Sequence, residues 1–377
     1  MTPVTAARGL DTSQAALAEA PLPPADPEEL QPALLASTAA RIADRAEAMG
    51  LTQWFWGEGV VLQGMLRLAE ATGTPARPFV AAFVDRHLRE GVGLDHVNHL
   101  APGAACADLY GMTQQEHYAD GCRRLLHWLR HAPEVTRAPG GALEHWPGGV
   151  WADTAFMAGT FLIHCGLHTG RPELVAEAGE QILAHAGVLQ HPGTGLYAHG
   201  SHEGRTIWCF WGRANAWTAL AAVEYLEAAG AGADPDMGDR MRETSDRIRA
   251  LLRRQLLALA DHQPAHGVWD VLVDGQPENR GILETSGTAG IAAAMFRAAA
   301  LGIEPERLRA AAWRALAGLH PYVAEDGTLT RTSAGTVLQL VPFGYSVIRN
   351  DTIQPWGQGL ALHAYAAALT DRARHRP

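Results

Sequence analysis

The stretch VWADTAFMAGTFLIHCGLHTG, residues 150–170, decides the fold of this chain. It opens on the polar motif Trp151-Ala152-Asp153, continues into small and apolar residues suited to a helix, and ends at Thr169-Gly170. The residues of the run 156–167 are small or apolar on nearly every face of the expected helix. Such a helix is expected to be buried on most of its faces.

The same arrangement, a polar motif followed by a small-residue helical run, occurs six times. The runs lie at residues 60–71, 104–110, 156–167, 214–227, 289–301 and 360–369. More polar helical segments with one-sided apolar stripes lie between them, such as 241–259 and 307–319. This alternation predicts an all-α fold, an (α/α)6 barrel with inner and outer rings of six helices, formed as one domain by residues 31–377. An irregular helical bundle or solenoid is the alternative.

In such a barrel the six polar motifs would open at one end. Aromatic faces beside a few polar side chains are suited to sugars, whose C–H faces pack on rings while their hydroxyls take hydrogen bonds. The tryptophans expected to line this cavity are Trp54, Trp56, Trp151, Trp211, Trp217 and Trp356. The polar residues expected beside them are Asn98, His145, Asp153, His199, Arg213 and Gln358.

Composition excludes several other functions. The chain has 377 residues and a net charge of −10, and it lacks a Lys/Arg-rich run, which argues against nucleic-acid binding. It contains no metal-binding H-E-x-x-H motif, phosphate-binding loop or G-x-S-x-G elbow, so neither a metal nor a cofactor is expected. No apolar run is long enough to span a membrane. Residues 1–30 are expected to form a flexible arm without a signal peptide, which predicts a cytoplasmic protein.

Asp153 is the strongest candidate for chemistry. Because Trp151, Phe156 and Met157 are its neighbours, burial is expected to raise its pKa toward the range of a general acid. The alternative is that Asp153 caps the helix through backbone N–H groups.

Two further side chains are candidate ligands for substrate. Arg213, between Trp211 and Trp217, is suited to a forked contact with a carboxylate, and a structural ion pair is its alternative role. His199 follows a Gly-rich turn and is expected to bind a sugar or a water, although a structural histidine fits the same pattern.

At these motifs the chain resembles the unsaturated glucuronyl and galacturonyl hydrolases of glycoside hydrolase families 88 and 105, especially the unsaturated rhamnogalacturonyl hydrolases of family 105. The similarity runs from about residue 54 to residue 368. Its most specific pieces are the segments 150–157, 194–200, 211–217 and 284–289.

The resemblance implies an (α/α)6 barrel in which Asp153 is the general acid/base. Asp153 would protonate C4 of a 4,5-unsaturated uronic acid and then help water to add at C5, which releases the neighbouring sugar. A second functional aspartate of the family corresponds here to Asn98, by its distance from Pro102, or to Asp95. The residues expected to contact substrate are His145, Trp151, Met157, His199, Trp211, Arg213, Trp217, Trp56 and Trp356.

One departure from the family concerns the residues after the arginine. Where the family usually has Gly-Asn-Gly, this chain has Ala214-Asn215-Ala216, whose two methyl groups predict a narrower site. The expected partner is an anionic unsaturated oligosaccharide, and the expected state is a monomer or homodimer. Two alternatives stay open: a sugar epimerase or isomerase that uses His145 with His199, and a non-catalytic sugar-binding protein.

Overall fold

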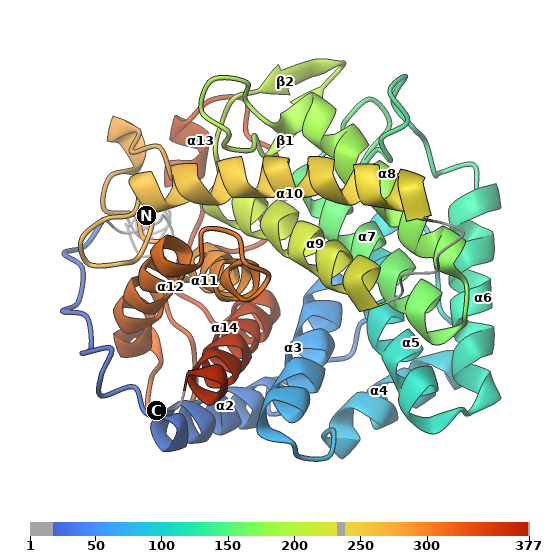
Figure 1. Ribbon diagram of the computed structural model, residues 1–377, viewed down its shortest axis with the longest axis horizontal. Coiled ribbons are helices and arrows are strands. Elements are labelled where there is room, and N and C mark those ends of the chain that lie inside the picture. Colours follow the sequence, from blue (N-terminus) through green and yellow to red (C-terminus); the bar gives the residue numbers. More distant parts are fainter. Residues whose placement is uncertain (1–17, 232–237, 376–377) are drawn as a thin grey trace, which may run out of the picture.

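A closed ring of six inner helices forms the centre of the computed structural model, which describes residues 18–231 and 238–375. The inner helices are α3 (Trp56–Thr72), α5 (Ala101–Thr113), α7 (Ala152–His168), α9 (Gly212–Ala231), α11 (Thr285–Ala300) and α14 (Pro355–Arg374). Each packs on the next, and α14 packs back on α3, which closes the ring (Figure 1). The predicted (α/α)6 barrel is confirmed.

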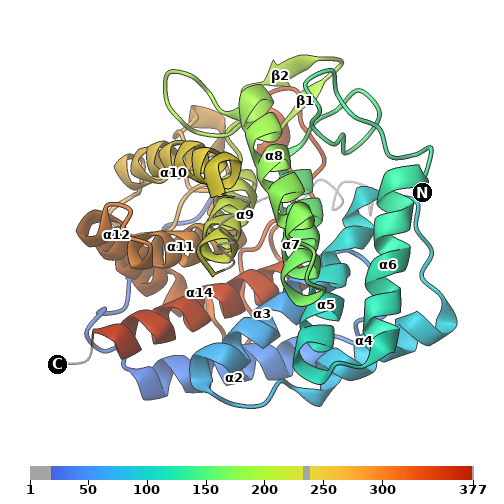
Figure 2. The ribbon, with the colours of Figure 1, turned by 45° about the vertical axis from the view of Figure 1, so that its right-hand side comes forward.

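Six outer helices surround this ring and alternate with the inner ones along the chain (Figure 2). They are α2 (Pro32–Glu47), α4 (Pro78–Glu90), α6 (Glu116–His131), α8 (Pro172–Leu189), α10 (Gly238–Asp261) and α12 (Pro305–Leu319). Four of the six begin with a proline, which fits the first helical turn because its N–H would have no intrahelical partner. None of the described helices combines the length and apolarity needed to cross a bilayer.

Small residues allow the inner helices to approach closely, as the sequence predicts. A Cβ atom added at Gly64 of α3 would lie 2.6 Å from the carbonyl oxygen of Gly359 on α14. One added at Gly359 would lie 2.6 Å from the backbone of Val60. Any larger side chain at either position would push the first and last inner helices apart.

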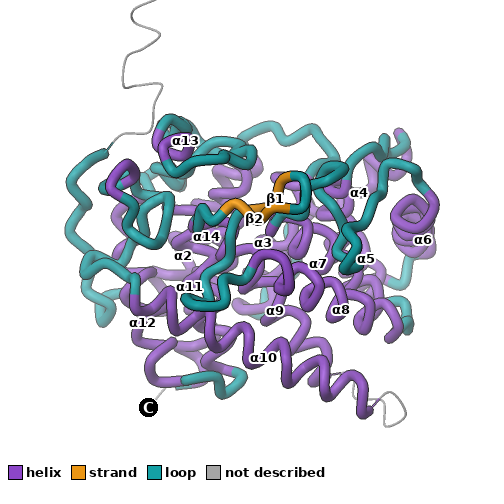
Figure 3. Tube along the Cα trace, turned by 90° about the horizontal axis from the view of Figure 1, so that it is seen from above, coloured by secondary structure: helices purple, strands orange, loops and turns teal. Residues whose placement is uncertain are grey.

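Several short elements that belong to neither ring of helices lie together on one side of the barrel (Figure 3). They include the hairpin β1 (Gly200–His202) and β2 (Arg205–Ile207), and the short helix α13 (Phe343–Ser346). The remaining short turns are η1 (Val97–Leu100), η3 (Pro277–Asn279) and η4 (His320–Tyr322).

The N-terminal segment is attached to the barrel over much of its described length. Residues 1–17 of the predicted flexible arm lie outside the described residues. Beyond them, the backbone N–H of Glu19 donates to Gly281, that of Ala25 donates to Ala317, and Leu30 is fully buried. Residues 19–30 are therefore anchored to the barrel, contrary to a free arm.

Candidate active site

The first turns of the inner helices meet at one end of the barrel. Trp56 of α3 stacks on Trp356 of α14 with ring centroids 4.3 Å apart, and its edge faces Trp217 of α9 at 6.2 Å. Trp217 in turn packs against Phe156 of α7 at 4.9 Å. The predicted convergence of the polar motifs is thus observed for the helices that carry these rings.

A hairpin places His199 beside the start of α7. The backbone N–H of Ala152 donates to the carbonyl of His199 at 2.9 Å, and that of Ser201 donates to Val150 at 2.8 Å. Gly200 permits this approach, because a Cβ there would lie 2.7 Å from Cδ1 of Trp151. Residues about fifty positions apart in the chain are thereby held next to each other.

Asp153 lies in the first turn of α7 and is nearly buried, with an exposed fraction of 9%. Its Oδ2 atom is 3.4 Å from Nε2 of His199. This oxygen has no hydrogen-bond partner among the described residues, and Trp151, not Asp153, occupies the N-cap position. The capping alternative is therefore wrong, and the carboxylate faces the histidine.

The predicted rise of the Asp153 pKa is also wrong. Burial does raise the pKa of this carboxyl, but the contact with His199 and the positive charge of Arg213 outweigh burial and hold the pKa below its ordinary value. The carboxylate is consequently ionised at neutral pH when no substrate is bound.

A row of aromatic and imidazole rings leads across the site beside Asp153. His145 stacks on Trp151 with centroids 4.4 Å apart and planes 11° apart. His199 packs between Trp151 and Trp211, at 5.2 Å and 4.3 Å. His96 meets the edge of His145 at 4.6 Å, so the row extends to the turn η1. Such a row offers flat apolar faces together with ring nitrogens that can bond hydroxyl groups.

Two of these histidines are neutral at physiological pH. Burial lowers the pKa of His145 to about 3 and that of His96 to about 4. Nδ1 of His145 bonds the hydroxyl of Thr154 at 2.9 Å, which fixes the ring. Both rings therefore act as polar neutral groups and do not carry charge to a ligand.

The two candidates for the second catalytic position differ sharply in burial. The Asp95 side chain is 84% exposed and pairs with His99 at 3.4 Å, so the structure places it at the surface and not in the buried site. Asn98 on η1 is buried, with 8% exposed, and its Oδ1 atom has no partner among the described residues. Asn98 is thus the candidate that the structure retains.

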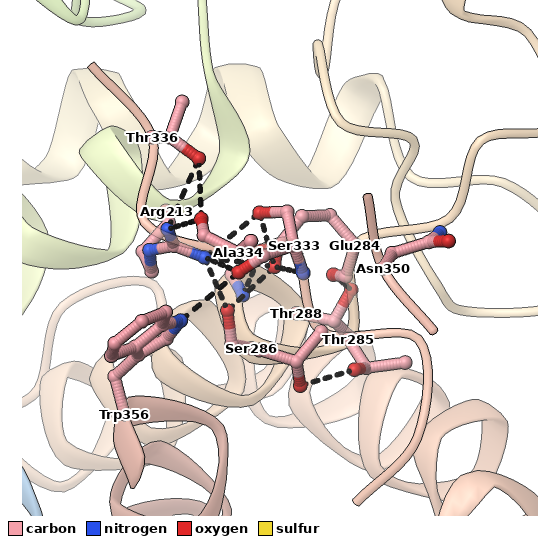
Figure 4. Close-up of polar contacts among 12 residues, drawn as sticks. Arg213, Glu284, Thr285, Ser286, Thr288, Ser333, Ala334, Thr336, Asn350 and Trp356 are labelled. Carbon is pink, nitrogen blue, oxygen red and sulfur yellow. Dashed lines mark hydrogen bonds and ion pairs between the residues drawn. The ribbon is translucent and has the colours of Figure 1, made fainter. Parts of the chain in front are cut away.

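Arg213 is fully buried at the start of α9 and is held by other parts of the chain (Figure 4). Nη1 lies 3.2 Å from Oε1 of Glu284 and donates to Ser333 Oγ at 2.8 Å. Nη2 donates to the carbonyl of Ala334 at 3.0 Å and to Thr336 Oγ1 at 3.3 Å. The predicted open fork for a substrate carboxylate is therefore wrong, because both terminal nitrogens are already occupied.

The guanidinium nevertheless contributes a positive charge to the site and packs against two of its tryptophan rings. Its carbon lies 4.2 Å from the ring centroid of Trp211 and 5.5 Å from that of Trp356. Trp356 also donates from Nε1 to the carbonyl of Ser333 at 3.0 Å. Arg213 thus supports the ring row and the loop 333–336 at the same time.

Comparison with known proteins places the chain in a family. Residues 37–371 match the model of Glycosyl Hydrolase Family 88. The unsaturated rhamnogalacturonyl hydrolase YesR of Bacillus subtilis (strain 168) is 30% identical over 346 residues, which cover 89% of this chain and 94% of YesR. The chain belongs to glycosyl hydrolase family 88.

Solved structures share the fold of this chain. A possible member of family 105 from Salmonella enterica subsp. enterica serovar Paratyphi A superposes with a TM-score of 0.79 at 25% identity, over 90% of this chain and 94% of that one. A possible family 105 member from Klebsiella pneumoniae superposes with a TM-score of 0.80 at 24% identity, over 89% and 93%. Membership of glycosyl hydrolase family 88 makes the protein a hydrolase that acts on glycosyl bonds, which argues against the epimerase and the non-catalytic alternatives.

Several buried polar atoms of this family 88 site lack a partner among the described residues. Buried polar groups in folded proteins are almost always hydrogen-bonded, so a group of free ones indicates where a ligand or water binds. The free atoms are His96 Nε2, Asn98 Oδ1, Asp153 Oδ2, His199 Nε2, Trp211 Nε1, Arg213 Nε and Trp217 Nε1.

The remaining predicted contacts have mixed outcomes. Met157 is fully buried in the main apolar core of the family 88 barrel and packs there, so its predicted contact with substrate is not supported. Ala216 is likewise buried, and its methyl group fills the space beside Gly290 of α11. Asn215 bonds the backbone of Tyr197 through both its Oδ1 and its Nδ2 atoms, at 2.9 and 3.0 Å. The Ala-Asn-Ala segment therefore packs the barrel and holds the loop that carries His199.

Three residues that shape the site were not predicted from the sequence. His96 belongs to the ring row, Tyr345 of α13 bonds Nδ1 of His199 at 2.8 Å, and Glu284 holds Arg213. Glu284 lies in a motif that the sequence singled out, and His96 is two positions from Asn98. Tyr345 lies outside the six repeats, so the repeat pattern offered no signal for it.

Proposed function

We propose that the protein removes a 4,5-unsaturated uronic acid from the non-reducing end of oligosaccharides that a polysaccharide lyase has produced. The observation that carries this proposal is Asp153, a buried carboxylate with a free oxygen that faces His199 beside a row of rings. The name of the relative YesR, an unsaturated rhamnogalacturonyl hydrolase, supports this substrate class.

The proposed reaction begins with protonation of the substrate by Asp153. Asp153 gives its proton to C4 of the substrate, and the C4=C5 electron pair forms the new C–H bond. Positive charge then develops at C5 and on the ring oxygen. Water adds at C5 and returns a proton to Asp153, which leaves a hemiketal. The hemiketal opens by breaking the bond between C5 and the ring oxygen, and the hemiacetal left at C1 then releases the linked sugar.

Substrate binding causes Asp153, which is ionised in the free enzyme, to take up a proton from solvent. The uronate carries its own carboxylate, and a second negative charge in a site that excludes water raises the pKa of a neighbouring carboxyl. Nε2 of His199, 3.4 Å from Asp153 Oδ2, is placed to hold the carboxyl group in position against the substrate. The charge of Arg213 and the free N–H groups of Trp211, Trp217 and Arg213 Nε balance the substrate charge.

Ordinary displacement by two carboxylates does not fit this site. Retaining and inverting glycosidases need a second carboxylic acid opposite the first. In our proposal Asn98, whose amide cannot titrate, takes the second position, because it is buried while the Asp95 side chain is mostly exposed. Asn98 is instead suited to orient a hydroxyl or the attacking water through its free Oδ1. One carboxyl that carries a proton is sufficient for hydration of an enol ether.

The direct test is loss of the ultraviolet absorbance of the conjugated enuronate. The purified protein is incubated with lyase digests of pectin, glycosaminoglycan and ulvan, and the Asp153→Asn variant serves as the inactive control. Decay with the parent protein on at least one digest supports the proposal, and a flat trace on every digest overturns it. The cytoplasmic location and the monomeric or homodimeric state stay predictions.

A further inference from the structure

A second cluster of potential ligands lies far along the inner helices from Asp153, where α7 ends. His164 and His168 occupy the last two turns of α7, one helical turn apart, so both side chains lie on the same face. Asp108 of α5 faces them. The mechanism proposed above uses none of the three.

The three ligating atoms converge on one point. Oδ1 of Asp108 lies 2.5 Å from Nδ1 of His164 and 3.0 Å from Nε2 of His168. All three atoms lie within 4.8 Å of one another, and this is the only group of three or more such residues found in the described part of the chain. In a tetrahedral zinc site with bonds of about 2 Å the ligand atoms are roughly 3.3 Å apart, so shifts on the order of 1 Å are needed.

The outer contacts of the cluster resemble those found around metal-binding histidines. Nε2 of His164, the nitrogen turned away from Asp108, bonds Oε1 of Glu224 at 2.7 Å. Glu224 is itself held by Arg67 and Arg297. Histidines that bind a metal almost always donate their second nitrogen to a carboxylate or a carbonyl, which fixes the tautomer and the direction of the ring.

A small residue positions the other histidine. A Cβ atom added at Gly111 of α5 would lie 2.1 Å from Nδ1 of His168, so only glycine lets this ring lie against the helix. The Nδ1 edge then faces α5, and Nε2 is directed at Asp108.

The cluster is also open to solvent on one side. It borders a cavity of about 640 Å³ whose lining includes Asp108, His164, His168 and Met112. The His168 side chain is 33% exposed and that of Asp108 is 16% exposed. An ion can therefore enter, and a water can complete its coordination.

We propose that Asp108, His164 and His168 form a binding site for a divalent transition metal, with Zn²⁺ as the best match. Two imidazole nitrogens, one carboxylate oxygen and a water are a usual ligand set for zinc. The ion would link α5 to α7 at the end of the barrel away from Asp153, where it stabilises the fold and takes no part in glycosidic cleavage.

The test uses the full chain, without a histidine tag and stripped of metal. Titration with Co²⁺ should give the intense visible absorption of tetrahedral cobalt at one equivalent, and Zn²⁺ should displace it. Zn²⁺ should also raise the melting temperature. His168→Gln should abolish both responses, and Asp108→Asn provides a second variant if the first fails to fold.

A matched control comes from α6, where His127 and His131 form another exposed pair one turn apart, with rings 4.6 Å apart. The double variant His127→Gln/His131→Gln should keep the cobalt spectrum. Absence of stoichiometric binding, or loss of binding in the α6 variant with retention in His168→Gln, would overturn the proposal. Because the assay reads metal binding, its outcome is independent of whether the enuronate is cleaved.

Discussion

The hydroxyl of Tyr345 lies 2.8 Å from Nδ1 of His199, on the side of the ring opposite to Asp153. The two nitrogens of the imidazole ring thus face different partners, the tyrosine hydroxyl and the Asp153 carboxylate. Tyr345 thereby fixes the orientation of the histidine that contacts the proposed acid.

Removing that hydroxyl should slow the reaction and leave binding nearly unchanged. Tyr345→Phe loses one buried hydrogen bond, which is worth about 1 kcal/mol, or roughly fivefold in rate. Steady-state kinetics should show a lower kcat with a similar KM. A raised KM with an unchanged kcat would instead place Tyr345 in substrate binding.

Asp153→Asn should remove activity and preserve the fold. Loss of a positioned general acid lowers kcat by about 10²–10⁴-fold, and the melting temperature should stay close to that of the parent because the side chain caps no helix. Asp95→Asn is the matched control, since that carboxylate is 84% exposed and its removal should leave kcat unchanged. Residual activity above a tenth of the parent value would remove Asp153 from the proposed role.

Arg213→Lys should act mainly on stability. The lysine keeps the charge beside Glu284 but loses most of the hydrogen bonds to Ser333, Ala334 and Thr336, which costs on the order of 2–4 kcal/mol. Urea unfolding should report this loss. Unchanged stability with a higher KM would restore the forked contact with substrate that the sequence suggested.

Buried neutral histidines should make the protein sensitive to acid. Burial lowers the pKa of His185 to about 4 and that of His363 to about 3, as it does for His96 and His145. Each folded-state pKa lies below the unfolded value of about 6.5, so the unfolded chain binds protons first as the pH falls. Their contribution to stability is fully present above pH 6.5 and is lost between pH 6.5 and about 3–4.

His185→Gln isolates one of these groups. Its slope of unfolding free energy against pH, measured in urea from pH 7 to 4.5, should be shallower by up to about 1.4 kcal/mol per pH unit. A slope equal to that of the parent would show that His185 is protonated to the same extent in the folded and unfolded states.

The barrel could be predicted from the sequence because each inner helix is marked by residues that are adjacent in the chain. Small and apolar residues after each polar motif mark the inner helices, and Gly64 and Gly359 show why those residues are small. The inner helices begin two to five residues before the predicted runs, since the polar motifs themselves form the first turns, as in α7 from Ala152.

The electrostatics of the site depended on distant parts of the chain. The neighbours of Asp153 in the sequence are apolar and predicted a raised pKa, whereas folding brings His199 and Arg213 close to it. The hydrogen bonds that occupy the Arg213 guanidinium could not be predicted for the same reason. Its partners lie in the distant loop 333–336, which follows no helical pattern. Likewise, the spacing of His164 and His168 is visible in the sequence, but Asp108 is 56 positions away from His164.

The contact between α3 and α14 bears on how the chain folds during synthesis. These two helices join the beginning and the end of the ring, so the nascent chain exposes an open apolar seam along α3 and α11 until the last helix leaves the ribosome. We therefore expect ring closure to be a late, long-range event, and we expect truncation within α14 to leave an open arc of helices that is prone to aggregate.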